Sequence, residues 1–336
     1  MINSIWFIAL ALMLAAYAVL DGFDLGIGVL HLVLGRTTEE RTQLIDTIGP
    51  VWNGNEVWLL AAGGSMVVAF PTLYAASFSG FYLALMLVLW LLLLRGLGIE
   101  FRHQIHHPMW EHAWDVAFAV SSALLALLFG VAVGNVLRGV PFDVDGQFTG
   151  SFSVLLNPFA IVGGLLGVTT LAFHGACWAA LKTDGDLQAR ARRFAGRLWF
   201  VSIAVLGLMI AASFAVSPHF TDNFSRYPVL LLVPAATLGA LVLNRRALGR
   251  RDDRAAFRGS AAYVAGILAS VAAGLYPMLL PPLAGSPYPG LDIYNSAAPP
   301  HSLRTALAIY LFGIGLVSIY LANIYRIWSG KGSESS

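Results

Sequence analysis

The sequence is dominated by a succession of long apolar stretches. A helix needs about 20 residues to cross the hydrocarbon core of a bilayer, which is about 30 Å thick. Nine stretches are long enough, at residues 5–34, 49–70, 73–97, 113–137, 152–182, 194–216, 228–247, 259–280 and 305–328. The composition agrees, since 58% of the residues are hydrophobic and only 11% are charged, which lies outside the range of a soluble domain. The sequence therefore predicts an all-α integral membrane protein with nine transmembrane helices in a single polytopic domain, residues 1–336.

The basic residues predict how these helices are oriented. Of the 20 Lys and Arg residues, only Arg138, Arg226 and Arg304 fall on the side of the N-terminus. Because cytoplasmic loops carry an excess of Lys and Arg, we expect the C-terminus in the cytoplasm and the N-terminus outside. Residues 1–4 contain no Lys or Arg, so we expect the first stretch to remain as a span and not to be cleaved as a signal peptide. The basic clusters at residues 182–197 and 245–258 indicate contact with membrane lipid and not with nucleic acid.

Two acidic residues interrupt the first apolar stretch. Asp21 and Asp24 are three residues apart, so on a helix they project about 60° apart, from the same side. An aspartate near the middle of a membrane helix costs about 2.5 to 3.5 kcal/mol on insertion scales. This side of the helix must therefore face protein or water and not lipid.

Polar residues of the first three predicted helices gather at one level. Because the helices alternate in direction, residues 21–31, the start of the second helix and the end of the third all lie on the cytoplasmic side. The residues that meet there are Asp21, Asp24, Trp52, Asn53, Glu56, Arg95 and Glu100.

Two interpretations of this gathering remain open. One is a structural polar network of Asp21, Asp24, Trp52 and Arg95, in which the arginine neutralises Asp24 or Glu56. The other is a cytoplasmic path for protons through Glu100, Glu56 and Asn53, since chains of carboxylates, amides and water serve as relays in membranes. The two can coexist in one protein.

Histidines raise the question of haem or metal binding. Only His31 and His174 lie within predicted spans, where a haem held by both is geometrically conceivable. A single histidine on a helix is more often a hydrogen-bonded interior residue, so we expect no haem held by this chain. Four histidines between Arg102 and His112 have no recognisable ligand spacing, and we predict no metal site. Small residues at 63–64 and at 163, 164 and 167 predict close helix contacts.

Several motifs resemble one known family. They are residues 21–28 (DGFDLGIG), 49–58 (GPVWNGNEVW), 70–82 (FPTLYAASFSGFY), 129–135 (FGVAVGN), 139–142 (GVPF) and 156–159 (LNPF). Together they resemble subunit II of the cytochrome bd-type quinol oxidases, and residues 56–58 are similar to the cyanide-insensitive branch. The resemblance is specific over residues 15–160 and depends on hydropathy and length beyond that.

The resemblance implies a respiratory complex in the bacterial inner membrane. In this family, subunit II pairs with a haem-bearing subunit I, each built as two four-helix bundles plus a peripheral ninth helix. Subunit I carries haem b and haem d and oxidises quinol, while subunit II supports the haems and contributes to proton uptake. The complex reduces dioxygen to water and builds proton-motive force without pumping. No redox chemistry is expected in this chain alone, and some members add a structural quinone or a small single-span subunit.

The resemblance also bears on single residues. Glu100 occupies the position of a family carboxylate associated with proton uptake, and Arg95 matches a family arginine just before it. Asn53 departs from the usual aspartate, and an amide binds water but cannot ionise. Glu56, one turn further along, is its expected substitute. A proton-coupled secondary transporter is the alternative function, because transporters also carry acidic residues within their helices.

Overall fold

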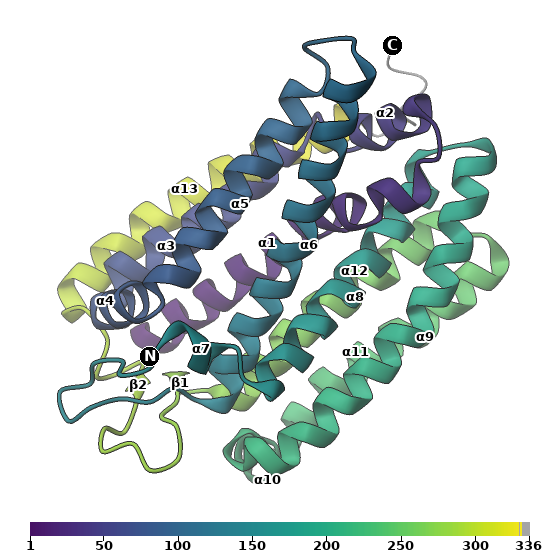
Figure 1. Cartoon of the computed structure of the whole chain (residues 1–336). Coiled ribbons are helices and arrows are strands. Elements are labelled where there is room, and N and C mark those ends of the chain that lie inside the picture. The colour runs from purple at the N-terminus through teal and green to yellow at the C-terminus, as the bar shows by residue number, and fades with distance from the viewer. Residues whose placement is uncertain (329, 331–336) are drawn as a thin grey trace.

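The chain folds into a bundle of long helices. The computed structural model describes residues 1–328 and 330, so the predicted cytoplasmic Lys331 lies outside the described residues. Within these residues, eight helices are long and apolar enough to span a membrane by themselves, which confirms the all-α membrane fold (Figure 1). They are α1 (Ile2–Leu34), α5 (Tyr82–Phe101), α6 (Pro108–Arg138), α8 (Pro158–Lys182), α9 (Gly185–Val216), α11 (Leu232–Arg250, continuing a turn that starts at Pro228), α12 (Asp253–Leu275) and α13 (Pro300–Ile327).

A ninth candidate span is bent. Helices α3 (Trp52–Ala69) and α4 (Pro71–Gly80) qualify only as a pair and meet at an angle of 120°. The expected span at residues 73–97 is therefore wrong in its boundaries, because its first part forms α4 and the crossing helix begins at Tyr82. Pro71 explains the break, since proline cannot continue the hydrogen bonding of α3 but fits the first position of a new helix.

Two other boundaries shift for local reasons. The expected span at 152–182 is interrupted at Leu156 and Asn157, between α7 (Phe152–Leu155) and α8, which begins at Pro158. The Asn157 side chain accepts a 3.0 Å hydrogen bond from the Ala160 N–H, so it caps α8. The expected span at 259–280 ends at Leu275, and the chain continues into strand β1 (Met278–Leu280), which pairs antiparallel with β2 (Leu291–Asp292).

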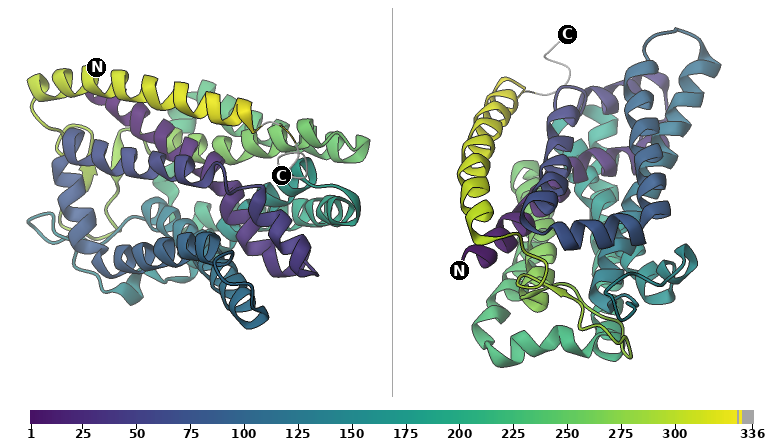
Figure 2. Two further views of the ribbon diagram at one scale, coloured as in Figure 1. Left: turned by 90° about the horizontal axis from the view of Figure 1, so that it is seen from above. Right: turned by 90° about the vertical axis from the view of Figure 1, so that its left-hand side faces the viewer.

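The helices form two groups of four. Helices α1, α3, α5 and α6 pack together, and α8, α9, α11 and α12 form the second group, with α6 and α1 packed against α8 between them. Helix α13 lies at the periphery against α3 and α1 (Figure 2). This arrangement matches two four-helix bundles plus a peripheral helix.

Glycines allow the two groups to approach closely. A Cβ atom on Gly26 of α1 would lie 2.0 Å from the Leu171 carbonyl oxygen, and one on Gly175 of α8 would lie 2.3 Å from the Gly26 carbonyl carbon. The predicted contact at Gly163 is also present, because a Cβ there would lie 2.7 Å from the Gly130 carbonyl oxygen of α6. Gly63 and Gly64 of α3 differ, since no described atom lies within 4 Å of a Cβ built on either.

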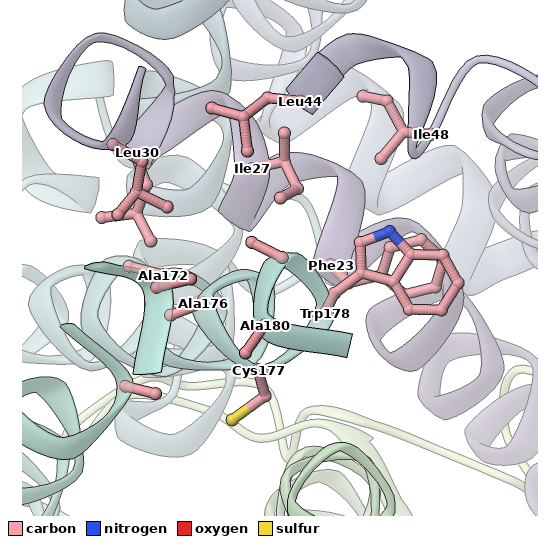
Figure 3. Close-up of a cluster of buried hydrophobic side chains, with 14 of the residues drawn as sticks. Phe23, Ile27, Leu30, Leu44, Ile48, Ala172, Ala176, Cys177, Trp178 and Ala180 are labelled. Atoms are coloured by element: carbon pink, nitrogen blue, oxygen red, sulfur yellow. The ribbon is translucent and has the colours of Figure 1, made fainter. Parts of the chain in front are cut away.

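The N-terminus and the last turn of α13 lie at opposite ends of the bundle (Figure 1). We call the end where α13 finishes the basic end; α1, α5, α8 and α11 also finish there, and the short helix α2 (Thr38–Asp46) caps it. Buried apolar side chains of α1, α2 and α8 meet beneath this cap, among them Ile27, Leu44 and Trp178 (Figure 3).

Ordered loops close the opposite end. The Leu283 N–H donates a 2.8 Å hydrogen bond to the Val140 carbonyl oxygen, so the loops that follow α6 and α12 are joined. The Trp6 indole of α1 donates a 3.1 Å hydrogen bond to the Leu303 carbonyl oxygen. The remaining short helices, η1 (Pro218–Thr221), α10 (Asp222–Arg226) and η2 (Pro228–Leu231), connect α9 to α11. Residues 140–146 and 281–289 form ordered, non-helical loops at this end.

Candidate functional site

A cluster of ionisable side chains lies between α1, α3 and α5, toward the basic end. Arg95 of α5 is at its centre, and its Nη2 lies 2.7 Å from Asp21 Oδ1 and 2.5 Å from Glu56 Oε1. The Arg95 and Asp21 side chains are fully buried, whereas the Glu56 side chain is 26% exposed. Glu56 therefore connects a buried ion pair to the surface of this chain.

Asp24 belongs to the same cluster but bonds to an amide. Its Oδ2 accepts a 2.8 Å hydrogen bond from Asn55 Nδ2, and no described cation lies within salt-bridge distance of it. Asn55 Nδ2 also donates a 3.0 Å hydrogen bond to the Leu20 carbonyl oxygen, and Asn55 Oδ1 accepts a 2.8 Å hydrogen bond from the Tyr325 hydroxyl. This chain of bonds ties α13 to α3 and α1 through the cluster.

Several buried polar atoms of the cluster have no described hydrogen-bond partner. They are Tyr17 Oη, Asp21 Oδ2, Asp24 Oδ1, Trp52 Nε1, Arg95 Nε and Arg95 Nη1. Polar atoms in a protein interior are nearly always satisfied by protein or by ordered water. So many unpaired atoms around a few ionisable groups distinguish this region from the apolar cores on either side of it.

The structure brings together only some of the residues singled out from the sequence. Asp21, Asp24, Glu56 and Arg95 meet, with Trp52 buried beside them. Arg95 pairs with Glu56, one of the two partners expected for it, and its second partner is Asp21 and not Asp24. Asn53 lies on the exposed face of α3, and Glu100 is exposed near the end of α5. Asn55 and Tyr325 were missed.

A second polar cluster lies at the basic end itself. Asp115 of α6 receives three groups: His31 Nε2 at 2.7 Å, Arg102 Nε at 2.6 Å and Arg41 Nη1 at 3.2 Å. Arg102 Nη1 also donates a 2.8 Å hydrogen bond to Thr42 Oγ1 of α2. Sequence reasoning overlooked this cluster, although an aspartate inside an apolar stretch at residue 115 was a signal of the same kind as Asp21.

The two histidines considered for haem both take part in protein hydrogen bonds. His31 contacts Asp115, and His174 contacts Ser260 Oγ at 2.8 Å and the Val19 carbonyl oxygen at 3.0 Å. Within the described residues, no group of three or more His, Cys, Asp or Glu side chains is arranged to hold a metal ion.

Comparison with known families decides what kind of protein carries this site. Residues 2–328 match the family described as "Cytochrome bd terminal oxidase subunit II". The chain belongs to this family. It is therefore a subunit of an oxidoreductase complex of the bacterial inner membrane, and the family implies a subunit I partner that carries the haems.

Individual relatives of the cytochrome bd subunit II family agree over most of the chain. The chain is 36% identical to "Probable cytochrome oxidase subunit 2" of Haemophilus influenzae, covering 97% of this chain and 92% of the relative. It is 34% identical to "Cytochrome bd-I ubiquinol oxidase subunit 2" of Escherichia coli K12, covering 82% and 81%. It is 33% identical to "Cytochrome bd ubiquinol oxidase subunit 2" of Bacillus subtilis, covering 94% and 93%.

A solved structure supports the fold. A chain of the bd oxidase from Geobacillus thermodenitrificans superimposes with a TM-score of 0.80, over 97% of this chain and 98% of that chain, at 18% sequence identity. At this identity the likeness concerns the arrangement of helices and not the chemistry of the site.

Proposed function

We propose that this chain supports the haem-bearing subunit I of a cytochrome bd-type quinol oxidase and supplies it with a cytoplasmic path for protons. The complex oxidises quinol and reduces dioxygen to water, and the basic end of the bundle faces the cytoplasm. One observation carries the proton path: the partly exposed carboxylate of Glu56 bonds directly to the buried Arg95, which bonds to Asp21. A proton that reaches Glu56 is therefore separated from the fully buried Asp21 by a single residue, Arg95.

The rotation of α3 supports a route along the outside of this chain. Asn53 lies on the same exposed face as Leu60, Gly64 and Val67, at spacings of 7, 11 and 14 residues. We place subunit I against this face. Asn53 and Glu56 then lie at the basic end of the interface between the subunits, where an amide holds water and a carboxylate exchanges protons. Glu100 lies exposed on the same end of the bundle, as a group at the start of the route.

The unpaired polar atoms support water in the cluster. Buried water occupies sites that offer it two to four polar partners, and the atoms around Asp21, Asp24 and Arg95 offer several. Carboxylates separated by water form the usual proton relay inside membrane proteins.

The experiment compares Glu56→Gln and Glu100→Gln in the purified two-subunit complex, with Glu39→Gln as a control of equal charge change. Glu39 lies exposed on α2 at the same end and outside the proposed route. We expect either path variant to lower quinol-driven oxygen consumption about tenfold, since a positioned proton-transfer group contributes at least that much. The haem absorption spectrum should not change. Unaltered turnover in both path variants would remove the proton-path proposal and leave the family assignment intact.

The alternative of a proton-coupled secondary transporter predicts a chain that is stable and binds a substrate by itself. The oxidase proposal predicts that the chain depends on subunit I. Membership of the bd oxidase subunit II family favours the second, and expression of the chain alone and with its partner distinguishes them.

A further inference from the structure

We propose that the seam between α9 and α11, at the basic end, binds the headgroup of an anionic phospholipid through Arg197 and Arg245. The lipid's acyl chains lie along the apolar side chains that follow these arginines on the two helices. This site is far in sequence from the carboxylate cluster and does not depend on the proton path.

Arg245 is held in place across the seam. Its guanidinium carbon lies 5.6 Å from the ring centroid of Trp199 and 5.0 Å from that of Phe200, so the α11 side chain rests on two aromatic rings of α9. The Trp199 indole donates a 3.0 Å hydrogen bond to the Leu241 carbonyl oxygen, which fixes that ring between the helices. A Cβ built on Gly196 would lie 3.7 Å from Arg245 Nη1, so the guanidinium extends over a position without a side chain.

The positive charges of the seam are not neutralised by protein. Arg193 and Arg197 lie one turn apart on α9, both exposed, and neither they nor Arg245 takes part in any salt bridge among the described residues. Nearby, Arg190 pairs with Glu40 and Arg192 with Asp253. Like charges one helical turn apart repel each other. An anion at the seam removes this repulsion.

The surface next to these arginines favours a lipid over a free anion. Toward the middle of the bundle, α9 exposes Phe200 (58%) and Leu208 (54%), and α11 exposes Val242 (48%) and Leu238 (51%). Charge at the level of the headgroups followed by exposed apolar surface matches the two parts of a phospholipid. Inorganic phosphate matches only the charged headgroup. An acidic protein segment would likewise leave the exposed apolar side chains uncovered, because it lies outside the acyl region.

The experiment uses the intact two-subunit complex, stripped of lipid in detergent and titrated with tetraoleoyl cardiolipin. Bound lipid is counted by native mass spectrometry. The double variant R197Q/R245Q is compared with R246Q/R250Q, which removes the same charge from exposed arginines of the same end that contact no aromatic ring in the described structure. We expect R197Q/R245Q to weaken cardiolipin binding about 25-fold, or about fivefold for each arginine, and the control to weaken it less than about threefold.

A milder variant keeps the proposal testable if the double variant fails to assemble. Phe200→Leu retains both charges and removes one ring beneath Arg245, and we expect affinity to fall about threefold. The site would be overturned if both double variants lost the same cardiolipin affinity, or if the wild type bound phosphatidylethanolamine as tightly as cardiolipin. Either result would mean that the arginines act only as diffuse surface charge. Displacement of cardiolipin by an equimolar amount of inorganic phosphate would overturn the lipid assignment. The lipid assignment would also be overturned if, in the lipid-free complex, a protein chain covered Arg245 and protected it from an arginine-modifying reagent.

Discussion

Arg95 of α5 and Asp21 of α1 form a fully buried ion pair, with 2.7 Å between Nη2 and Oδ1. The two residues lie on helices that are not neighbours in sequence, and α3 contributes Glu56 to the same guanidinium at 2.5 Å. Burial of a charge is tolerated when it is paired, and removal of one partner leaves the other uncompensated. Arg95 therefore holds three helices in one arrangement.

The first prediction concerns this pair. Arg95→Gln leaves Asp21 and Glu56 without a cation, so we expect a loss of about 3 to 5 kcal/mol in stability and a lower yield of assembled complex. Thermal unfolding of the purified complex measures it, with the exposed Arg304→Gln as a control that should change little. The double variant R95Q/D21N should recover part of the loss. If it is as unstable as the sum of the two single variants, the pair contributes no coupling.

The membrane fold was predictable because hydrophobic length alone selects the spans. The break at Pro71 falls between the expected spans 49–70 and 73–97. The breaks at Phe81 and before Pro158 were not foreseen, since both lie inside apolar sequence and hydropathy alone does not register them. The depth of the polar residues in the membrane was also predictable, because it follows from the direction of each helix, which the distribution of arginines indicates.

The rotation of α3 could not be derived from the sequence. Asn53, Asn55 and Glu56 lie within four consecutive positions and point in different directions around α3, so the sequence alone left open which of them faces inward. Packing against α1 and α13 turns Asn55 toward Asp24 and Tyr325 and leaves Asn53 exposed. The Asp115 cluster likewise requires α1, α2, α5 and α6 to converge, and no local pattern predicts such a convergence.

The second prediction concerns Asp115. Asp115→Asn removes the carboxylate that His31, Arg41 and Arg102 share, so we expect α2 to detach more readily from the basic end. A cost of about 3 kcal/mol is the scale for breaking a buried charge network. Limited trypsin digestion checks it, because Arg36 and Arg41 flank the start of α2 and should be cleaved faster. Glu111→Gln, one turn earlier on α6 and without a described hydrogen bond from its side chain, is the matched control.

The third prediction is a pH dependence at α2. The Arg190 guanidinium, 2.5 Å from Glu40, holds the pKa of that carboxyl below its ordinary value of 4.5. A carboxylate with a lowered pKa contributes stability above its unfolded pKa, and the contribution disappears as the pH falls through the folded pKa. We expect Glu40→Gln to lower stability by about 0.5 to 1 kcal/mol at pH 7.

The wild type and Glu40→Gln should converge as the pH falls below about 4.5. Unfolding temperatures of the two complexes between pH 7 and pH 4 provide the measurement. A constant difference over this range would mean that the pair with Arg190 does not form in solution.

The last prediction concerns the exposed face of α3. Gly63 and Gly64 leave open space in this chain, although close helix contacts in membranes use such small residues. If subunit I packs on this face, Gly64→Leu introduces a side chain where another backbone approaches, while the chain itself has room for it. We expect the variant chain to be produced and inserted normally but to co-purify with subunit I at least fivefold less well, the effect of about 1 kcal/mol in an interface. Gly207→Leu on α9 is the matched control, since its Cβ would also meet nothing within 4 Å and it lies in the second group of helices. Equal recovery of subunit I with both variants would place the interface elsewhere, and with it the route past Asn53.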